Sequence, residues 1–458
     1  MTEAEARQIL TLPPAQAVAK ILVLAQKAEQ YDQLVGAVSP TTPSGMTPVY
    51  LKAAAPLKKI KRPGRKRGHA GAGRRRSVQV DQFQDHTLTH CPHCQTSVKK
   101  PIRQYQRTIE DIPPLEKPQV TQHTIYGYWC AGCQKIVYPP VTEALPNAVI
   151  GLRLVVFTAW LHYLVGVSVS HISRLLAVLC RFPISAGGLT QAWKNLAFLL
   201  EPRYQEVGRQ IAGSGVLHAD ETGWRLNGRT HWLWCFTTQT LCYYLITPGR
   251  GSPVIRQVLG ELFSGILVCD FWGAYNKIGA LAKQRCFFHL FTELLKVDKV
   301  NRSLAWQAFR KTLTRLLKDA VRLSEQKNQK APEVYARLVQ KLKDRLARLL
   351  EIEGCDRDVR RLLKRLKRHR DELFTFLNYE NVSPYNNHAE QQMRKPVLTR
   401  KVSQQNRSDQ GAKTQAILMT LFRTAELQGK NPMEAILSLA KSFVQNKHGQ
   451  DLNLKLAA

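Results

Sequence analysis

The sequence predicts an α/β fold in which a mixed sheet is followed along the chain by a long helical segment. The first indication is a set of short runs rich in β-branched and aromatic residues around one helical stretch. In chain order they predict strands at 216–219, 231–237 and 241–247, a helix at 252–263 and a strand at 265–269. The second is Asn227-Gly228, a strong hairpin signal between the first two strands. The third is the helical and very basic pattern from 281 to 377.

The order of these elements narrows the fold class. Three strands, a helix and a fourth strand are the opening order of a ribonuclease-H-like fold, so we expect a ribonuclease-H-like core. In that fold the first and fourth strands are neighbours, and side chains at their ends lie close together.

The charge balance points to a class of partner. The chain has 67 Lys and Arg against 34 Asp and Glu, a formal net charge of +33. Such a surplus repels itself in a compact fold and is usually offset by a polyanion. Nucleic acid is favoured over an anionic membrane surface, because the basic residues are spread over most of the chain. With 44% hydrophobic residues the composition is that of a globular protein.

The N-terminal segment combines a helix with a basic arm. Residues 15–35 place apolar side chains at helical spacing and predict a short amphipathic helix that is able to self-associate. From Lys52 to Arg76 there are eleven Lys and Arg and no acid, which indicates a flexible arm. Contact with DNA phosphates or the minor groove is favoured over a solubilising linker. The arm residues expected to bind DNA are Arg65, Lys66, Arg67, Arg74, Arg75 and Arg76.

Two CxxC pairs predict a metal site. Cys91 and Cys94 form the first pair, Cys130 and Cys133 the second, and 35 residues separate them. Four thiolates at knuckle spacing suit a tetrahedral structural Zn²⁺, so a zinc ribbon is expected. The redox alternative requires a single exposed CxxC at a helix start within a βαβ unit, and that context is missing.

The region from 152 to 207 is expected to be helical. A helix near His171, a Gly-containing turn and a second helix after Ser185 resemble a helix-turn-helix, although ordinary helical packing explains the pattern equally well. The apolar stretch 151–170 is interrupted by Arg153 and His162, so we expect a buried helix there and no membrane span. The N-terminus lacks the features of a signal peptide, which favours a cytoplasmic protein.

Three acidic residues are candidates for catalysis. Asp220 is expected to end the first strand, Asp270 to end the fourth, and Glu390 to lie on a helix packed at the sheet edge. Three carboxylates suit a pair of hard Mg²⁺ or Mn²⁺ ions, which prefer oxygen ligands and support phosphodiester cleavage. Singly, each acid is more often a turn or cap residue. Whether Asp220 or Glu221 points inward is open.

Longer motifs resemble a known family. They include Asp270-Phe-Trp-Gly-Ala-Tyr275, Arg285-Cys-Phe-Phe-His-Leu290 and Asn387-His-Ala-Glu-Gln-Gln-Met-Arg394. Across most of its length the chain is similar to bacterial transposases of the insertion-sequence sixty-six family, TnpC type, in the Asp-Asp-Glu superfamily. The resemblance implies that Asp220, Asp270 and Glu390 are the metal-binding triad. It also implies that the helical segment between Asp270 and Glu390 is an insertion into the core.

Further candidates surround the triad. The resemblance makes Cys286 and His289 a pair that follows the second Asp, while a packing Cys and a buried His explain them equally well. His218 lies two residues before Asp220 and is an auxiliary candidate or a structural residue. Phosphate contact and a solvated basic surface are equally good explanations of the cations that follow Glu390. These are Arg394, Lys395, Arg400 and Lys401.

Together these patterns predict a transposase that cleaves transposon ends and joins 3′-hydroxyls to target DNA. The alternatives are a nuclease that does not join, and a non-catalytic remnant that binds DNA. Expected partners are DNA, further copies of the chain and accessory transposition proteins, with no membrane and a nucleoid-associated location. The predicted segments are the amphipathic helix (1–37), basic arm (38–80), zinc ribbon (81–142), helical DNA-binding region (143–212), first part of the core (213–280), basic helical insertion (281–378) and the catalytic Glu helix with the C-terminal helices (379–458).

Overall fold

The computed structural model has a central sheet surrounded by helices. It describes residues 9–36, 80–90, 92–99, 102–103, 105–106, 109, 117–132, 134–353, 356–403 and 406–447. Near the N-terminus, helix α2 spans Pro14–Gly36, where the sequence predicts a helix. The short strands β1 (Tyr128–Cys130) and β2 (Lys135–Val137) form an antiparallel hairpin. The six cations expected in the basic arm lie outside the described residues.

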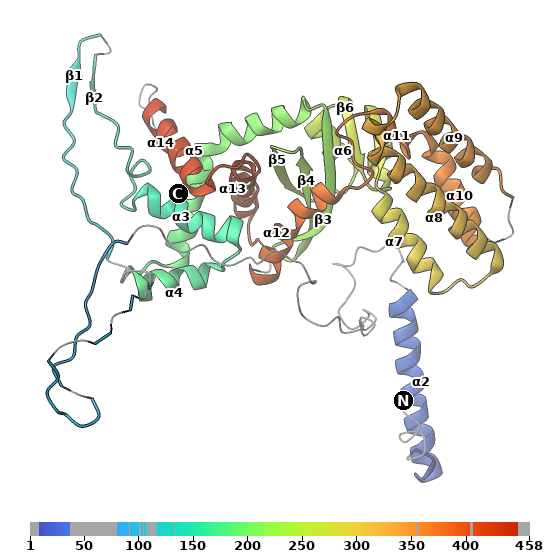
Figure 1. Ribbon diagram of the computed structural model, residues 1–458, viewed down its shortest axis with the longest axis horizontal. Helices are drawn as coiled ribbons and strands as arrows, with labels where there is room; N and C mark the ends of the chain where they lie inside the picture. The colour runs from blue at the N-terminus through green and yellow to red at the C-terminus, as the bar shows by residue number, and fades with distance from the viewer. Residues whose placement is uncertain are drawn as a thin grey trace.

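A five-stranded mixed sheet forms the centre of the molecule, with strand order β5-β4-β3-β6-β7 (Figure 1). Strands β3, β4 and β5 are antiparallel, whereas β6 and β7 run parallel to β3. Their bounds are β3 Val216–Leu226, β4 Arg229–Thr237, β5 Cys242–Thr247, β6 Leu262–Cys269 and β7 Gly279–Arg285. The predicted hairpin is present, with positive φ at both Asn227 (45°) and Gly228 (74°), as a tight two-residue turn requires. The first and fourth predicted strands are neighbours in the sheet, as the sequence analysis expects.

Two predicted boundaries were wrong. Asp220 does not end β3, because pairing with β4 continues to Leu226 opposite Arg229. Parallel pairing with β6 does stop earlier, at His218 opposite Val268, so Asp220 lies just beyond the point where β3 leaves β6. Helix α6 (Ser252–Leu259) is shorter than expected, because Gly260 adopts a φ of 78° and ends it before β6 begins.

Strand β7 was missed by the sequence analysis, which places its last five residues in the helical insertion. Its sequence, Gly-Ala-Leu-Ala-Lys-Gln-Arg, is poor in β-branched and aromatic residues. Pairing with β6 nevertheless holds it in the sheet. On its other side, the Thr375 hydroxyl donates to the Lys283 carbonyl (2.5 Å), and Gln284 donates to the Leu373 carbonyl (3.0 Å). Tertiary contacts therefore override local propensity here.

Helices on both sides of the sheet share one hydrophobic core with it. Helix α5 buries Trp193 and Ile211 in this core, and α13 covers the free edge of β5 (Figure 1). At that edge the Cys242 and Tyr244 N–H groups donate to the hydroxyls of Thr424 (3.1 Å) and Thr420 (2.9 Å). These bonds satisfy strand groups that would otherwise be open to pairing with another chain. The helices are α3 Leu152–Trp160, the π-helix η2 Leu161–Val165, α4 Val169–Leu179, α5 Ala186–Ala212, α13 Asp409–Leu427 and α14 Pro432–Lys447.

A second core lies in the helical segment between β7 and residue 386. It packs against β6 through Ile266 and Val268. The leucine face of α9 is ordinary helix packing, with Leu342, Leu346 and Leu349 buried. The helices are α7 Phe287–Asp298, α8 Leu304–Glu325, α9 Pro332–Leu350, α10 Arg357–Arg368 and α11 Thr375–Asn378. Short 3-10 turns are η3 Gly273–Lys277, η4 Lys327–Gln329 and η5 Arg370–Glu372.

Helix α12 (Asn387–Ser403) crosses the sheet against β3 and β4. The sequence predicts that it ends near Pro396, but it continues for seven residues. Met393, Pro396 and Thr399 are all buried, so packing on the sheet outweighs the one backbone hydrogen bond that proline removes. Within the described part of the chain, none of the helices has the length and apolar character that crossing a membrane requires. The apolar stretch near residue 160 forms α3 and η2, which are largely buried, as predicted.

Candidate active site

Three sequence-predicted acids come from three separate elements. Asp220 lies within β3, Asp270 follows the last residue of β6, and Glu390 lies in the first turn of α12. Strands β3 and β6 are neighbours, and α12 packs on β3. The fold therefore brings together residues that are up to 170 positions apart in the sequence.

The charges of neighbouring acids act on Asp220. Burial raises its pKa well above the ordinary value, and the charges of Glu221, Asp270 and Glu390 raise it further. One hydrogen bond acts in the opposite direction, from the Glu221 backbone N–H to Asp220 Oδ1 (3.0 Å). Such a cluster of like charges is unfavourable in a partly desolvated site unless a cation joins it or protons are taken up.

Glu221 has partners of its own, which bears on the choice between it and Asp220. Its Oε1 accepts from Arg250 Nη2 (2.9 Å) and Nε (3.1 Å), and its Oε2 accepts from the Tyr275 hydroxyl (2.8 Å). Burial and the charge of Asp270 raise the pKa of Glu221 to about 7, although Arg250 and Tyr275 lower it. The Glu221 side chain is 2% exposed and both of its oxygens are engaged, whereas Asp220 has only its bond to the backbone.

Two tryptophans hold Arg250 in place. Its guanidinium carbon lies 4.3 Å from the Trp232 ring centroid and 3.9 Å from that of Trp272, which is cation–π geometry. The Trp272 indole N–H donates to the Arg250 carbonyl (3.1 Å), and the Trp272 backbone N–H donates to Asp270 Oδ1 (2.8 Å). Among the described residues, Arg250 is therefore the only Lys or Arg that pairs with a carboxylate of this acid cluster, and the carboxylate is that of Glu221.

Sequence reasoning missed these supporting residues. Tyr275 belongs to a motif that the sequence analysis quotes, so its position was a signal, but Arg250 carries no recognisable pattern. Arg285 was noted only as a neighbour of Cys286. It is fully buried and donates to the Asp270 carbonyl (2.7 Å), to Asn276 Oδ1 (2.8 Å) and to Glu372 Oε2 (2.6 Å). Arg285 thereby fixes the backbone that carries Asp270.

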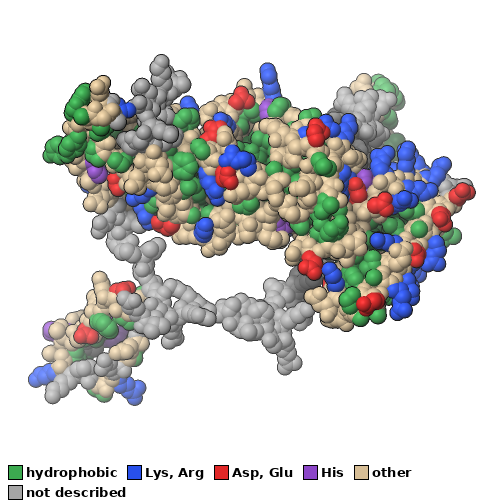
Figure 2. Space-filling view, turned by 90° about the horizontal axis from the view of Figure 1, so that it is seen from above, with side chains coloured by type: hydrophobic (Ala, Val, Ile, Leu, Met, Phe, Trp, Pro, Cys, Tyr) green, Lys and Arg blue, Asp and Glu red, His purple; other side chains and the backbone are tan. Residues whose placement is uncertain are grey.

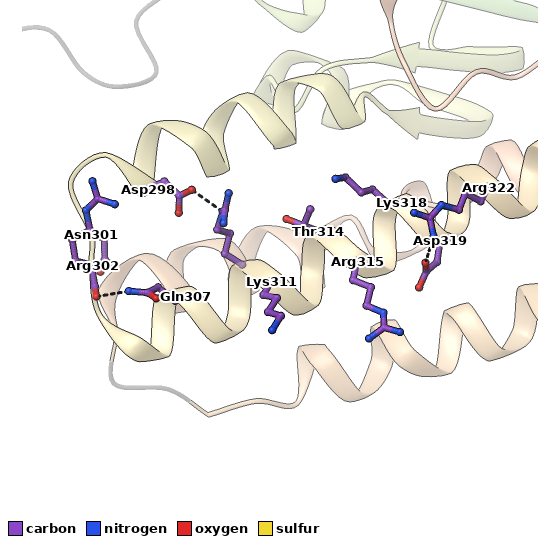
Figure 3. Close-up of a pocket in the computed structure, with 11 residues that line it drawn as sticks. Asp298, Asn301, Arg302, Gln307, Lys311, Thr314, Arg315, Lys318, Asp319 and Arg322 are labelled. Atoms are coloured by element: carbon purple, nitrogen blue, oxygen red, sulfur yellow. Dashed lines mark hydrogen bonds and ion pairs between the residues drawn. The ribbon is translucent and has the colours of Figure 1, made fainter. Parts of the chain in front are cut away.

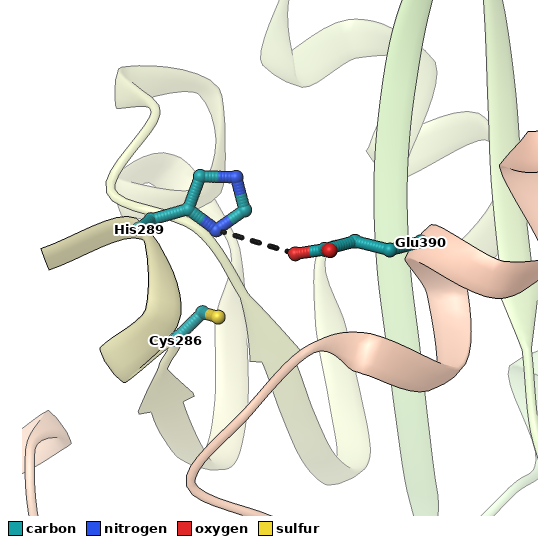
Figure 4. A group of neighbouring side chains, drawn as sticks. All are labelled: Cys286, His289 and Glu390. Carbon is teal, nitrogen blue, oxygen red and sulfur yellow. Dashed lines mark ion pairs between the residues drawn. The ribbon is translucent and has the colours of Figure 1, made fainter. Parts of the chain in front are cut away.

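Glu390 lies opposite the predicted pair Cys286 and His289. Figure 4 shows the three side chains directed at one another, and their ligand atoms all lie within 4.8 Å. His289 Nδ1 is 3.8 Å from Glu390 Oε1, and both atoms are buried with no hydrogen-bond partner. Cys286 caps the start of α7, where its sulfur accepts from the Asn386 N–H (3.1 Å). Burial raises its pKa to about 11, so the sulfur is a thiol at neutral pH.

The spacing of the acids bears on how they hold metal. Among the described residues, Asp220, Asp270 and Glu390 do not form a group with all ligand atoms within 4.8 Å. A single small ion needs that closeness, but a pair of ions does not. Two ions about 3.5–4 Å apart, each with oxygens at about 2.1 Å, are spanned by carboxylates with wider separations.

His218 is a buried structural contact. Burial lowers its pKa to about 4, so the ring is neutral at neutral pH. Its Nδ1 donates to Asn386 Oδ1 (3.1 Å), and the Asn386 amide donates to the Ala219 carbonyl (2.8 Å). His218 therefore contacts the residue that precedes α12, the helix that carries Glu390.

The cations that follow Glu390 differ in their surroundings. Lys395 forms an ion pair with Glu426 (3.0 Å), and Arg400 donates to the Gly223 carbonyl of β3. Arg394 and Lys401 are exposed and form no ion pair among the described residues. Of the expected zinc ligands, Cys94 and Cys130 are described, and Cys130 ends β1. Cys91 and Cys133 lie outside the described residues.

Lys and Arg gather over the helical segment of α8 to α10 (Figure 2). There, a groove of about 760 Å³ runs along α8 (Figure 3). Arg310 pairs with Asp298 (2.7 Å) and Arg322 with Asp319 (3.6 Å). The other cations that line the groove form no ion pair among the described residues. They are Arg302, Lys311, Arg315 and Lys318.

Comparison with known proteins identifies the class to which this fold and acid cluster belong. Residues 148–414, more than half of the chain, match the family described as Transposase IS66 family. The class is that of transposases. The chain belongs to the IS66 family of transposases. It is also 25% identical over 287 residues to an uncharacterized protein, y4qI, of Sinorhizobium fredii. That match covers 55% of this chain and 52% of the relative, so the chain spans about half of that protein's length.

Proposed function

We propose that the chain cleaves the DNA ends of its element and joins the freed 3′-hydroxyls to target DNA, with Asp220, Asp270 and Glu390 as the catalytic triad. The observation that carries the proposal is geometric: Asp220 and Asp270 lie where the neighbouring strands β3 and β6 part, and α12, which carries Glu390 in its first turn, packs on β3. It is supported by membership of a transposase family, whose model extends across all three acids.

We also propose that the core is ribonuclease-H-like, because of the order of its strands along the chain and within the sheet. Three antiparallel strands are followed by two parallel strands on the other side of β3. The two aspartates lie where β3 and β6 part, and the segment between β7 and α12 has a core of its own. That separate core supports its description as an insertion.

The residues present fit a divalent cation. Among the described residues, Arg250 is the only arginine that pairs with a carboxylate of the acid cluster, and it binds Glu221. Glu390 Oε1 is buried without a hydrogen-bond partner, which is costly for a charged group unless a cation binds it. Asp220, Asp270 and Glu390 would hold Mg²⁺ or Mn²⁺. The ions would activate the attacking oxygen and stabilise the leaving oxygen of the phosphodiester.

The chain's own residues position the acids. Arg250 and Tyr275 hold the Glu221 carboxylate. Arg285 fixes the Asp270 backbone, and Asn386 fixes the start of the helix that carries Glu390. Preorganised groups of this kind lower the cost of reaching the transition state, because they do not need to reorient during the reaction.

A strand-transfer assay on DNA that carries the ends of the element tests the proposal. We expect Asp270→Asn to abolish both cleavage and joining while DNA binding survives. Asp371→Asn is the matched control, since that side chain is 88% exposed and remote from the triad. Cleavage without joining would favour the nuclease alternative. Full activity in Asp270→Asn would contradict the catalytic triad.

Other expectations remain proposals. We propose that Cys91, Cys94, Cys130 and Cys133 bind one structural Zn²⁺, supported by the β1–β2 hairpin that brings the chain back after Cys130. The basic groove on α8 supports DNA as the partner, because phosphate contacts require unpaired cations. Handling two DNA ends requires at least two copies of the chain. Accessory proteins and a cytoplasmic, nucleoid-associated location belong to the same proposal.

A further inference from the structure

A second pocket, of about 840 Å³, lies beside α12 at some distance from the acid cluster. Its walls come from the starts of α4, α5 and α13 and from the C-terminal half of α12. Trp224 of β3 also lines it, four residues beyond Asp220, and so does Arg400, ten residues beyond Glu390. A strand rises about 3.3 Å and a helix about 1.5 Å per residue. The distance from Asp220 to Trp224 along β3 and the distance from Glu390 to Arg400 along α12 are therefore both roughly 13–15 Å.

Three helix N-termini face this pocket. Each helix begins with a serine cap whose side chain accepts a hydrogen bond from one backbone N–H of the first turn. The capping residues are Ser168, Ser185 and Ser408. Residues of each first turn line the cavity, among them Ser170, Gly187 and Gln410. The first N–H groups of a helix have no partner within the helix, and the macrodipole adds partial positive charge there. The three dipoles thus act on one volume.

Side-chain charge acts in the same direction. Lys194, Arg400 and Arg407 line the pocket, and no carboxylate does. Lys194 and Arg407 form no ion pair among the described residues, and Arg400 donates only to a backbone carbonyl. The nearest acid at these helix starts, Asp409, is exposed and does not line the cavity. Positive potential here is therefore not neutralised by the protein.

An independent observation points to a polar ligand in the pocket. Thr414 lines it and is only 3% exposed, yet its hydroxyl Oγ1 has no hydrogen-bond partner. Ser403 Oγ, from the facing end of α12, is likewise buried without a partner and lines the same pocket. Buried hydroxyls are normally hydrogen-bonded. Two buried hydroxyls without partners in one cavity therefore favour a polar ligand there.

We propose that this pocket binds backbone phosphates of the DNA strand whose cleavage occurs at the acid cluster. Helix N-termini, Lys, Arg and hydroxyls are the groups that bind phosphates in protein–DNA complexes. A spacing of roughly 13–15 Å places the pocket within a few nucleotides of the acid cluster along one strand, since each nucleotide adds about 3.4 Å along the duplex axis and the strand also winds around it. The inference rests on the proposed function and adds a specific contact for its substrate.

The test measures how DNA binding depends on salt, using the full chain and a short fluorescent duplex of arbitrary sequence. Each phosphate contact contributes about 0.9 to the slope of log K against log salt concentration. We expect Lys194→Gln and Arg407→Gln each to reduce the slope by about 0.9. Lys430→Gln, at the opposite end of α13 and exposed, is the control with the same charge change and an unaltered slope. If the two pocket variants give the slope of Lys430→Gln, the proposal is overturned.

A substitution that leaves the charge unchanged tests the role of the Thr414 hydroxyl. Thr414→Val keeps the shape and is expected to weaken duplex binding about tenfold without changing the salt slope, because a hydrogen bond to a charged phosphate is lost. Unchanged affinity in a folded Thr414→Val would count against the pocket. Since Lys194 and Arg407 are at the surface, their variants keep the test decisive if Thr414→Val fails to fold.

Cleavage is measured separately on the same preparations. A reduced slope in the pocket variants supports the phosphate site even if the wild-type chain shows no Mg²⁺-dependent cleavage, a result that would remove the proposed function alone. Mg²⁺-dependent cleavage together with unchanged slopes would overturn the pocket and leave the triad intact.

Discussion

His218 and Asn386 are 168 positions apart in the sequence, yet His218 Nδ1 lies 3.1 Å from Asn386 Oδ1 in the interior. The same Asn386 donates its side-chain amide to the Ala219 carbonyl and its backbone N–H to Cys286 Sγ. One residue therefore joins the strand of Asp220, the start of α7 and the start of the helix that carries Glu390: its side chain contacts the strand and its backbone N–H contacts α7. The relative position of the acids depends on this buried asparagine.

Asn386→Ala is expected to lower cleavage strongly, by roughly a hundredfold or more, because a small displacement of α12 misplaces Glu390. Leaving the His218 ring and the Ala219 carbonyl without partners also destabilises the fold, by about 1–3 kcal/mol. Single-turnover cleavage and denaturant unfolding measure the two effects. Asn387→Ala changes the next residue, which is exposed, and serves as the control. Normal cleavage by Asn386→Ala would show that Asn386 does not position α12.

The acid cluster predicts that stability depends on pH and metal. In the folded state the pKa of Glu221 is about 7 against an ordinary 4.5, and that of Asp220 is also raised. The folded protein thus holds these protons more tightly than the unfolded chain. The associated stability is complete below the unfolded pKa and is lost as pH rises through the folded pKa. We expect metal-free protein to lose stability between about pH 4.5 and 7, and Glu221→Gln to lose less.

The proposed metal site predicts that divalent cations reverse this loss, because they would bind the ionised acids. Mg²⁺ should raise the melting temperature of the wild-type chain more at about pH 8 than at about pH 5. Thermal melts with Mg²⁺ and with a chelator measure the difference. A melting temperature that responds equally to Mg²⁺ at both pH values, or does not respond, speaks against metal binding at these acids.

The buried Arg285 predicts a large effect at Glu372. Burial acts to raise the pKa of Glu372, but hydrogen bonds from His369 and Arg285 and the Arg285 charge lower it to about 2. Glu372→Gln leaves Arg285 without its carboxylate in the interior, which should cost about 3–5 kcal/mol of stability. Asp371→Asn, at the neighbouring exposed acid, is the control. The free energies of unfolding of the two variants are measured in denaturant. Equal values would refute the role of Glu372 as the carboxylate partner of Arg285.

The cysteine pairs predict about one zinc per chain by metal analysis, in the ratio that one four-ligand site requires. Cys94→Ser and Cys130→Ser should each lower the zinc content, because each removes a proposed ligand. Cys180→Ser is the control, since Cys180 lies in the helical region outside both pairs. Purified protein without zinc, or zinc retained in both Cys94→Ser and Cys130→Ser, would exclude the site.

Features that depend on local sequence were predicted, whereas features that depend on tertiary contacts were missed. The hairpin at Asn227-Gly228 and the helices of the insertion were predicted, because turn chemistry and apolar periodicity are local properties. Strand β7 was missed, since Ala, Lys and Gln have low strand propensity and pairing with β6 places them in the sheet. Asp220 was misplaced at a strand end because the polar residues that follow it interrupt the apolar pattern, while hydrogen bonds to β4 continue the strand.

The sequence by itself determined the class of this protein: its charge, its transposase motifs and the three acids are written in residue identity and order. Only the tertiary structure decided which of two adjacent carboxylates has side-chain partners and which does not. The sequence could not separate Asp220 from Glu221, because both are acids on one strand. The fold supplies Arg250 and Tyr275 to Glu221, whereas the Asp220 carboxylate accepts one bond, from a backbone N–H, among the described residues. Electrostatic energy depends on distance and burial, and those arise only when remote segments pack together.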